Sequence, residues 1–212
     1  MFTGRRPLMP TKTFNTTAKP ILRDIEADDT RAALRIWDRE FGLEADDAAA
    51  EWIEDATDTD RQDVWGVVAE DLAAGEVVGF GLAAIGPREW ADGYFRGLIE
   101  QDLPNDCAVM HVGCVASNYQ GRGLGKRIFK ARFKWARRQG ANAVLGVSWV
   151  REGRYGSSAL FEHFGFERLK TVPNYYSEHF DEFSSCPDCG APCECDAAFY
   201  AWGLGSLGDA DP

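Results

Sequence analysis

The chain has little lysine, few histidines and no long apolar segment, and each shortage narrows what it can be. Its 212 residues include only six Lys and three His. No run approaches the roughly 18 apolar residues that a membrane-spanning helix needs. The N-terminus also lacks the apolar core of a secretory signal. We therefore expect a cytoplasmic, soluble protein with no membrane partner and with residues 1–19 as a polar lead-in.

Acidic residues dominate the charge. The chain has 19 Asp and 15 Glu against 17 Arg and six Lys, which gives a formal net charge of −11. Such a surface disfavours contact with phosphate backbones, so we expect no nucleic acid partner. A surface rich in Asp and poor in Lys stays hydrated in concentrated salt and favours a halophilic host. A merely acidic mesophilic protein is the alternative.

The pattern of apolar residues predicts an α/β fold with one domain over residues 20–204 and a tail over 205–212. Hydrophobic residues make up 45% of the chain, which is ample for one packed core. The expected strands begin near Ile21 and cover 63–71, 76–86, 107–117, 143–150, 166–176 and 197–204. The expected helices follow Asp28–Thr30 and cover 45–57, 87–101, 121–140 and 155–165. These elements predict a mixed central sheet flanked by helices.

A glycine-rich corner lies where a strand runs into a helix. The segment "QGRGLG" covers residues 120–125. The first N–H groups of a helix lack partners, its dipole is positive there, and glycines leave room for an anion. Arg122, Lys126 and Arg127 add charge, so the corner predicts a seat for phosphate or pyrophosphate. A plain tight turn is the alternative, and a P-loop is excluded because Gly-Lys-Ser/Thr is absent.

Two segments carry a family resemblance. "QGRGLG" matches the Gln/Arg-x-x-Gly-x-Gly/Ala acyl-CoA signature of the GNAT superfamily of N-acetyltransferases, and "SALFEHFGF" (158–166) is similar to its second signature. The resemblance implies a sheet splayed between its fourth and fifth strands. It also implies transfer of an acetyl group from acetyl-CoA to a primary amine of a small molecule or peptide. A catalytically weak acyl-CoA-binding or sensing module is the alternative, and both monomer and homodimer stay open.

The resemblance also implies which residues bind the cofactor. Backbone N–H groups of the corner would hold the CoA pyrophosphate: Gln120, Gly121, Arg122, Gly123, Leu124, Gly125 and Lys126. The main chain of Cys114, Val115 and Ala116 would run beside the pantetheine arm. The N–H of Val115, or of a close neighbour, would polarise the thioester carbonyl.

The catalytic proton donor of the family is missing. Phe161 stands where many members have the tyrosine that protonates the thiolate. Tyr155 is our first candidate substitute; Tyr175, Tyr176, Ser157 and Ser158 are the others, and protonation of the thiolate by water is the alternative. His111 is the candidate base. It lies four residues before Val115, so strand alternation predicts that both side chains share a face. A histidine buried for packing alone is the alternative.

Four cysteines lie within ten residues. The segment "CPDCGAPCEC" contains Cys186, Cys189, Cys193 and Cys195. Cys-x-x-Cys followed by Gly resembles a zinc knuckle, and four thiolates predict a structural Zn²⁺ rather than a catalytic one. Disulfides and an iron–sulfur cluster are the alternatives. The position of this loop places the predicted metal in the last hairpin of the sheet.

Overall fold

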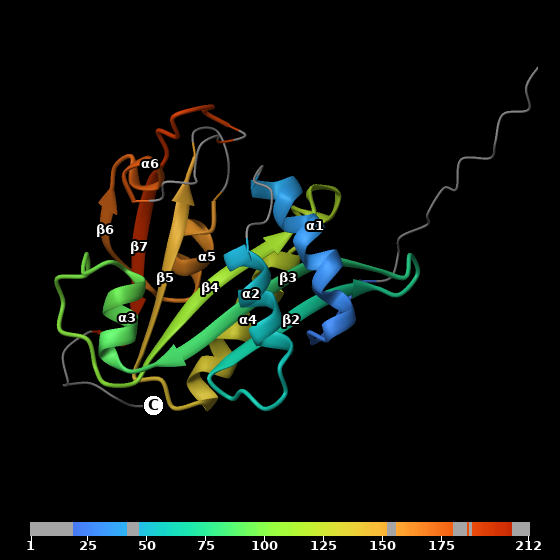
Figure 1. The fold of residues 1–212 in the computed structure, drawn as a ribbon, viewed down its shortest axis with the longest axis horizontal. Coiled ribbons are helices and arrows are strands. Elements are labelled where there is room, and N and C mark those ends of the chain that lie inside the picture. Colours follow the sequence, from blue (N-terminus) through green and yellow to red (C-terminus); the bar gives the residue numbers. More distant parts are fainter. Residues whose placement is uncertain (1–18, 42–46, 152–155, 180–185, 187, 205–212) are drawn as a thin grey trace, which may run out of the picture.

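The computed structural model describes residues 19–41, 47–151, 156–179, 186 and 188–204. Its centre is one seven-stranded sheet in the order β1-β2-β3-β4-β5-β7-β6 (Figure 1). The strands are β1 (Ile21–Asp24), β2 (Val64–Asp71), β3 (Glu76–Gly86), β4 (Cys107–Val115), β5 (Ala143–Val150), β6 (Glu167–Val172) and β7 (Asp196–Trp202). The helices are α1 (Thr30–Phe41), α2 (Asp47–Thr57), α3 (Arg88–Tyr94), α4 (Leu124–Arg138), α5 (Ser158–His163) and α6 (Tyr175–His179), with 3-10 turns η1 (Ala27–Asp29) and η2 (Ser117–Tyr119).

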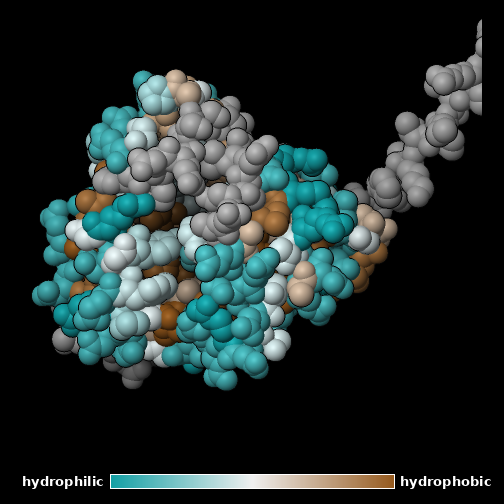
Figure 2. All heavy atoms as spheres, viewed as in Figure 1, coloured by the Kyte–Doolittle hydropathy of each residue, from teal (hydrophilic) through white to brown (hydrophobic). Residues whose placement is uncertain are grey.

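Helices cover both faces of the sheet. On one face α4 and α5 pack over the strands, because α4 buries Leu124, Ile128, Arg132 and Trp135 along a single stripe. On the other face α1 and α2 cover β2, β3 and β4, while α3 and α6 cover β4, β5 and β7. Figure 2 shows that the outward surface on the side of α1, α2 and α3 is largely hydrophilic, with hydrophobic residues visible between the helices.

Strand directions confirm the predicted mixed sheet. All neighbouring strands are antiparallel except β4 and β5, which are parallel. The cysteine-rich segment lies between β6 and β7, as expected. The strand predicted over 166–176 is shorter, because Tyr175 and Tyr176 begin α6 instead. The predicted helix over 87–101 ends at Tyr94.

Most of the predicted flanking segments lie outside the described residues. Of the lead-in over 1–19 only Lys19 is described, and the tail over 205–212 is not. Among the described helices none is long and apolar enough to span a bilayer.

Candidate active site

The site begins where β4 and β5 part. These strands pair only from Cys107 with Ala143 to Met110 with Gly146, although β4 continues to Val115 and β5 to Val150. Phe161 packs against Gly146 so closely that a Cβ there would collide with its ring. The sheet is therefore splayed between its fourth and fifth strands, which confirms the prediction.

A bulge in β4 lies at the same point. One residue of β3, Ala83, faces two residues of β4, Met110 and His111, because the register shifts between Leu82 and Ala84. Bulges commonly re-aim side chains next to active sites. The expectation that His111 and Val115 share a face is wrong for this reason. His111 faces α2 and α3, whereas Val115 packs on the α4 side.

The open edge of β4 offers backbone donors to the gap. The N–H of Ala116 donates to the carbonyl of Val78 in β3 at 3.0 Å. Because donors alternate along an antiparallel strand, the N–H groups of Gly113 and Val115 point to the opposite edge, toward β5. Cys114 turns its side chain into the core under α1. Of the three predicted pantetheine contacts, Val115 is therefore the one with a donor facing the gap, and Gly113 joins it.

The corner at the start of α4 has the geometry of an anion seat. Gly121 and Gly123 adopt φ of 72° and 78°, and a Cβ on either would meet no atom within 4 Å. The first helical bond runs from the N–H of Arg127 to the carbonyl of Gly123, so the three preceding N–H groups have no acceptor inside the helix. Arg122 and Lys126 are exposed beside them. Arg127 instead donates to the carbonyl of Pro20.

A buried carboxylate braces this corner, and no sequence motif pointed to it. Glu40, near the end of α1, accepts from the N–H and hydroxyl of Ser117 and from the amide of Gln120. The same amide donates to the carbonyl of Val115 at 2.8 Å. The N–H of Gln120 already donates to the carbonyl of Ser117. Gln120 therefore supports the corner through its side chain, unlike the predicted backbone contact with pyrophosphate.

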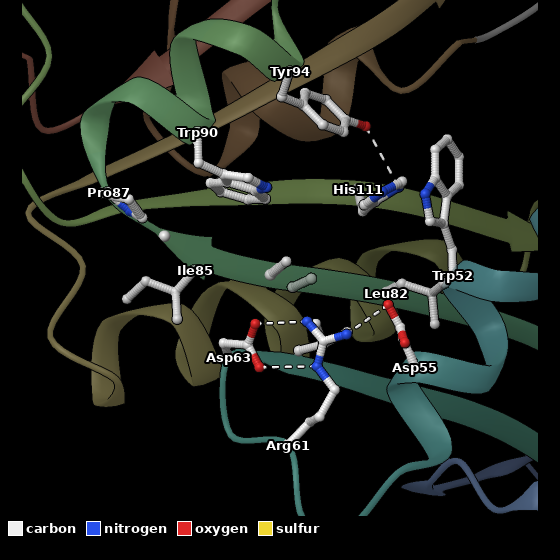
Figure 3. A pocket seen from close by; sticks show the side chains of 14 residues that line it. Trp52, Asp55, Arg61, Asp63, Leu82, Ile85, Pro87, Trp90, Tyr94 and His111 are labelled. Carbon is white, nitrogen blue, oxygen red and sulfur yellow. Dashed lines mark hydrogen bonds and ion pairs between the residues drawn. The ribbon is translucent and has the colours of Figure 1, made fainter. Parts of the chain in front are cut away.

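His111 is held between aromatic rings at the bulge (Figure 3). Its ring centroid lies 3.9 Å from that of Trp52 and 5.0 Å from that of Tyr94, and the Tyr94 hydroxyl is 3.4 Å from Nδ1. Burial, helped by the nearby charge of Arg132, lowers the pKa of His111 to about 3. The imidazole is therefore neutral across the physiological range.

Arg132 puts a positive charge under the bulge. Its Nη1 donates to the carbonyls of Leu82 and Val112, and its guanidinium lies over Gly81 and Gly113, where a Cβ on either glycine would collide with it. Nε has no hydrogen-bond partner, and no carboxylate among the described residues pairs with the group. Burial lowers the pKa of Arg132 to about 10, so it remains charged at neutral pH.

A pocket of about 280 Å³ opens beside His111 on the face of α2 and α3 (Figure 3). Its inner walls are largely apolar and aromatic, and its rim carries charge. The lining residues are Trp52, Asp55, Arg61, Asp63, Val64, Leu82, Ala83, Ala84, Ile85, Gly86, Pro87, Trp90, Tyr94 and His111.

The hydroxyl that replaces the missing tyrosine is not evident from the described residues. Phe161 is 2% exposed and stacks on Tyr200 with centroids 4.9 Å apart. Tyr155 lies outside the described residues. Ser158 donates to the hydroxyl of Ser148, which lies on β5 beyond the point where β4 departs. Ser148 therefore keeps a hydroxyl proton for another acceptor.

The four cysteines converge as predicted. Their sulfur atoms lie within 4.8 Å of one another, and all four thiols are free. The Sγ–Sγ distances are 3.7 Å for Cys186–Cys195, 3.8 Å for Cys189–Cys193 and 3.6 Å for Cys189–Cys195. A tetrahedron with Zn–S bonds of about 2.3 Å has edges of about 3.8 Å. The cluster therefore has the dimensions of a four-thiolate metal site.

Comparisons with known proteins agree with this geometry. Residues 23–166 match the model of the acetyltransferase (GNAT) family, which is more than half of the chain. The chain belongs to the GNAT family. The matched range includes β4, β5, the glycine corner at the start of α4, and α5. A search of curated proteins finds no significant match.

Solved structures with this fold are numerous, and three illustrate it. NAA60 of Arabidopsis thaliana, in complex with a bisubstrate analogue, is 15% identical with a TM-score of 0.61, over 86% of this chain and 97% of that one. The mosquito protein named arylalkylamine N-acetyltransferase like 5b is 16% identical with a TM-score of 0.60, over 86% of this chain and 98% of that one. A ribosomal-protein-alanine N-acetyltransferase of Brucella melitensis is 21% identical with a TM-score of 0.57, over 86% of this chain and 98% of that one. At these identities the likeness shows the shared GNAT fold.

Proposed function

We propose that this protein is an N-acetyltransferase that moves an acetyl group from acetyl-CoA to a primary amine. The observation that carries the proposal is the parting of β4 and β5 next to a helix N-terminus whose glycines leave its N–H groups open. The corner suits the pyrophosphate, and the gap suits an extended pantetheine arm along the edge of β4. Acetyl-CoA would supply an activated acyl group as a thioester.

The backbone at the gap would polarise the acyl group. The N–H groups of Val115 and Gly113 face the gap, and preorganised donors of this kind stabilise a developing oxyanion. Arg132 adds a fixed positive charge under the same stretch of β4. The negative charge that forms as the amine attacks is therefore met by two donors and a cation.

The acceptor loses two protons in all: the ammonium loses one to become the neutral amine that attacks, and the nitrogen loses the second as the new C–N bond forms and the C–S bond breaks. An alkylamine has a pKa near 10, so the neutral fraction that attacks is small at neutral pH. His111 remains the proposed catalytic imidazole because it lies at the inner end of the pocket. Its lowered pKa, however, makes it a weak base. We assign it the role of orienting the neutral amine by a hydrogen bond, with the proton passing to water.

The leaving thiolate takes up the second proton. A thiolate of pKa about 8.5 can leave and be protonated by solvent. Ser148, a buried residue of β5 whose hydroxyl accepts from Ser158, is a second proposed donor. Tyr155 remains a proposed donor.

The experiment that tests the function measures both products. The protein is incubated with acetyl-CoA labelled in the acetyl group and with a panel of primary amines. We expect the label on an amine in amounts equal to the CoA thiol released. Binding of acetyl-CoA by calorimetry with no labelled product from any amine would instead assign the chain to the acyl-CoA-binding modules.

We also propose that the four cysteines bind a structural Zn²⁺. The N–H groups of Asp188 and Glu194 donate to the sulfurs of Cys186 and Cys189, which stabilises thiolates in a turn. Elemental analysis should find about one zinc per chain, and a strong chelator should lower Tm. Absence of metal together with oxidised thiols would replace the zinc site with disulfides.

A further inference from the structure

The pocket beside His111 has two distinct parts. The inner part is formed by the rings of Trp52, Trp90 and Tyr94 and by the apolar side chains of β3, with Leu82 1% exposed. The outer part carries Arg61 with Asp55 and Asp63, whose side chains are 36%, 36% and 54% exposed. The pocket thus has an apolar interior and a charged entrance (Figure 3).

The entrance carries an excess of negative charge. Arg61 pairs with Asp55 and with Asp63, each at 2.7 Å, so one guanidinium faces two carboxylates. The hydrogen bond from Arg61 lowers the pKa of Asp63, which keeps that carboxylate ionised at neutral pH. Among the lining residues, the formal charges of Asp55, Asp63 and Arg61 sum to −1. This entrance favours a cation over an anion.

The interior fits a small apolar group. Pockets for drug-sized ligands hold roughly 300–1,000 Å³, and this one holds about 280 Å³. Trp90 lies flat against Gly86, since a Cβ on that glycine would come within 2.6 Å of the indole. Aromatic faces attract both apolar bodies and ammonium groups. The inner end reaches His111 at the bulge, where β4 leaves β5.

We infer that the acceptor is a small primary amine with an aromatic or compact apolar body, bound between α2 and α3. This inference rests on the proposed acetyl transfer and names its substrate class. The amine would enter past Asp55 and Asp63 as a cation. Its body would pack on Trp52 and Trp90, and its nitrogen would lie near His111. Polar amines, polyamines and peptide N-termini would leave these rings without a partner.

The test compares amines and pocket variants in the same assay. We expect kcat/KM for 2-phenylethylamine to exceed that for ethanolamine, spermidine and an Ala-initiated tripeptide by at least tenfold. Trp90→Ala should raise KM for 2-phenylethylamine at least tenfold, with kcat within about threefold, and should raise KM for ethanolamine by much less. Gly86→Ala should also raise KM for 2-phenylethylamine, because the new Cβ displaces the indole of Trp90 while the backbone at residue 86 can stay as it is. Trp202→Ala, which removes a tryptophan at the end of β7, is the matched control.

A binding arm separates this inference from the proposed function. Calorimetry measures 2-phenylethylamine binding to the protein saturated with CoA, for the wild type and for Trp90→Ala. Binding that Trp90→Ala weakens, without any turnover, would uphold the pocket and overturn acetyl transfer. Turnover of ethanolamine or peptide that equals turnover of 2-phenylethylamine, or a KM insensitive to Trp90 and Gly86, would overturn the pocket and leave acetyl transfer standing. No amine binding and no turnover would overturn both.

Discussion

The two sides of the splayed sheet are built in different ways. The proposed cofactor side is a nearly continuous segment, residues 113–126, that offers backbone N–H groups and bare glycines. The acceptor side is assembled from side chains on α2, the entry to β2, β3, α3 and β4. A backbone site fixes a ligand by its phosphates and peptide-like groups, whatever the surrounding side chains are. A site made of side chains from distant segments can change with any of them, so it sets what is specific to this chain.

The largest effect should come from the backbone of the cofactor side. Gly123→Val places a branched side chain at φ 78° in the proposed seat of the pyrophosphate. Strain of about 1–3 kcal/mol at such a residue, added to the lost space, should weaken acetyl-CoA binding by about 100-fold. Isothermal titration calorimetry measures this.

Gly75→Val is the matched control for that change. Gly75 has φ 67°, a Cβ on it would meet no atom within 4 Å, and it lies in the turn between β2 and β3. It should suffer similar strain without loss of acetyl-CoA affinity. Equal losses in the two variants would mean that the corner is only a turn.

A smaller effect is expected from the carboxylate that braces the corner. Glu40→Ala leaves the N–H and hydroxyl of Ser117 and the amide of Gln120 without their acceptor. Each hydrogen bond to a charged group is worth about 1.5–3 kcal/mol, and part of this should appear as roughly tenfold weaker acetyl-CoA binding.

Glu40→Gln sharpens the result. It keeps an oxygen that accepts from Ser117, but its NH2 group cannot accept from the amide of Gln120, so its affinity should lie between that of the wild type and that of Glu40→Ala. If Glu40→Gln weakened binding as much as Glu40→Ala, the charge rather than the brace would matter.

The burial of His111 on the acceptor side should make the free energy of unfolding depend on pH. His111 has a folded pKa of about 3, below its unfolded value near 6.5. The unfolded chain therefore binds a proton that the folded chain does not. Stability should fall as pH drops from 6.5 toward 3, by up to about 1.4 kcal/mol per pH unit from this group.

Urea unfolding of wild type and His111→Gln across this range measures the difference. The variant should lose the part of the slope that belongs to His111. Identical slopes would show that the imidazole is not desolvated. Because burial moves the titration of His111 away from pH 6.5, His111→Gln should not remove any acidic limb from the pH profile of kcat/KM near that pH.

The fold and the shape of the glycine corner could be predicted from the sequence because their signals are local. The positive φ angles at positions 121 and 123 favour glycine there, and the helix that follows has its own apolar stripe. The four cysteines likewise converge within ten residues.

The acceptor side could not be predicted in the same way. The bulge at Met110 and His111 reverses the alternation on which the position of His111 was based, and no single residue of the segment signals it. On the side of the glycine corner, Glu40 was missed as well, because it reaches Ser117 across 77 positions of the chain, a distance at which no spacing rule applies. Trp52, Trp90 and Tyr94 looked like ordinary helix residues until the fold placed them around one pocket.

The central claim is that the two sides meet at the gap between β4 and β5. It is tested most directly by a conjugate in which the sulfur of CoA is joined through an acetyl linker to the nitrogen of 2-phenylethylamine. If both sides are engaged at once, the second contact is intramolecular, so the conjugate should bind at least 100-fold more tightly than CoA. Both Gly123→Val and Trp90→Ala should reduce that affinity. An affinity equal to that of CoA, insensitive to Trp90→Ala, would contradict the account.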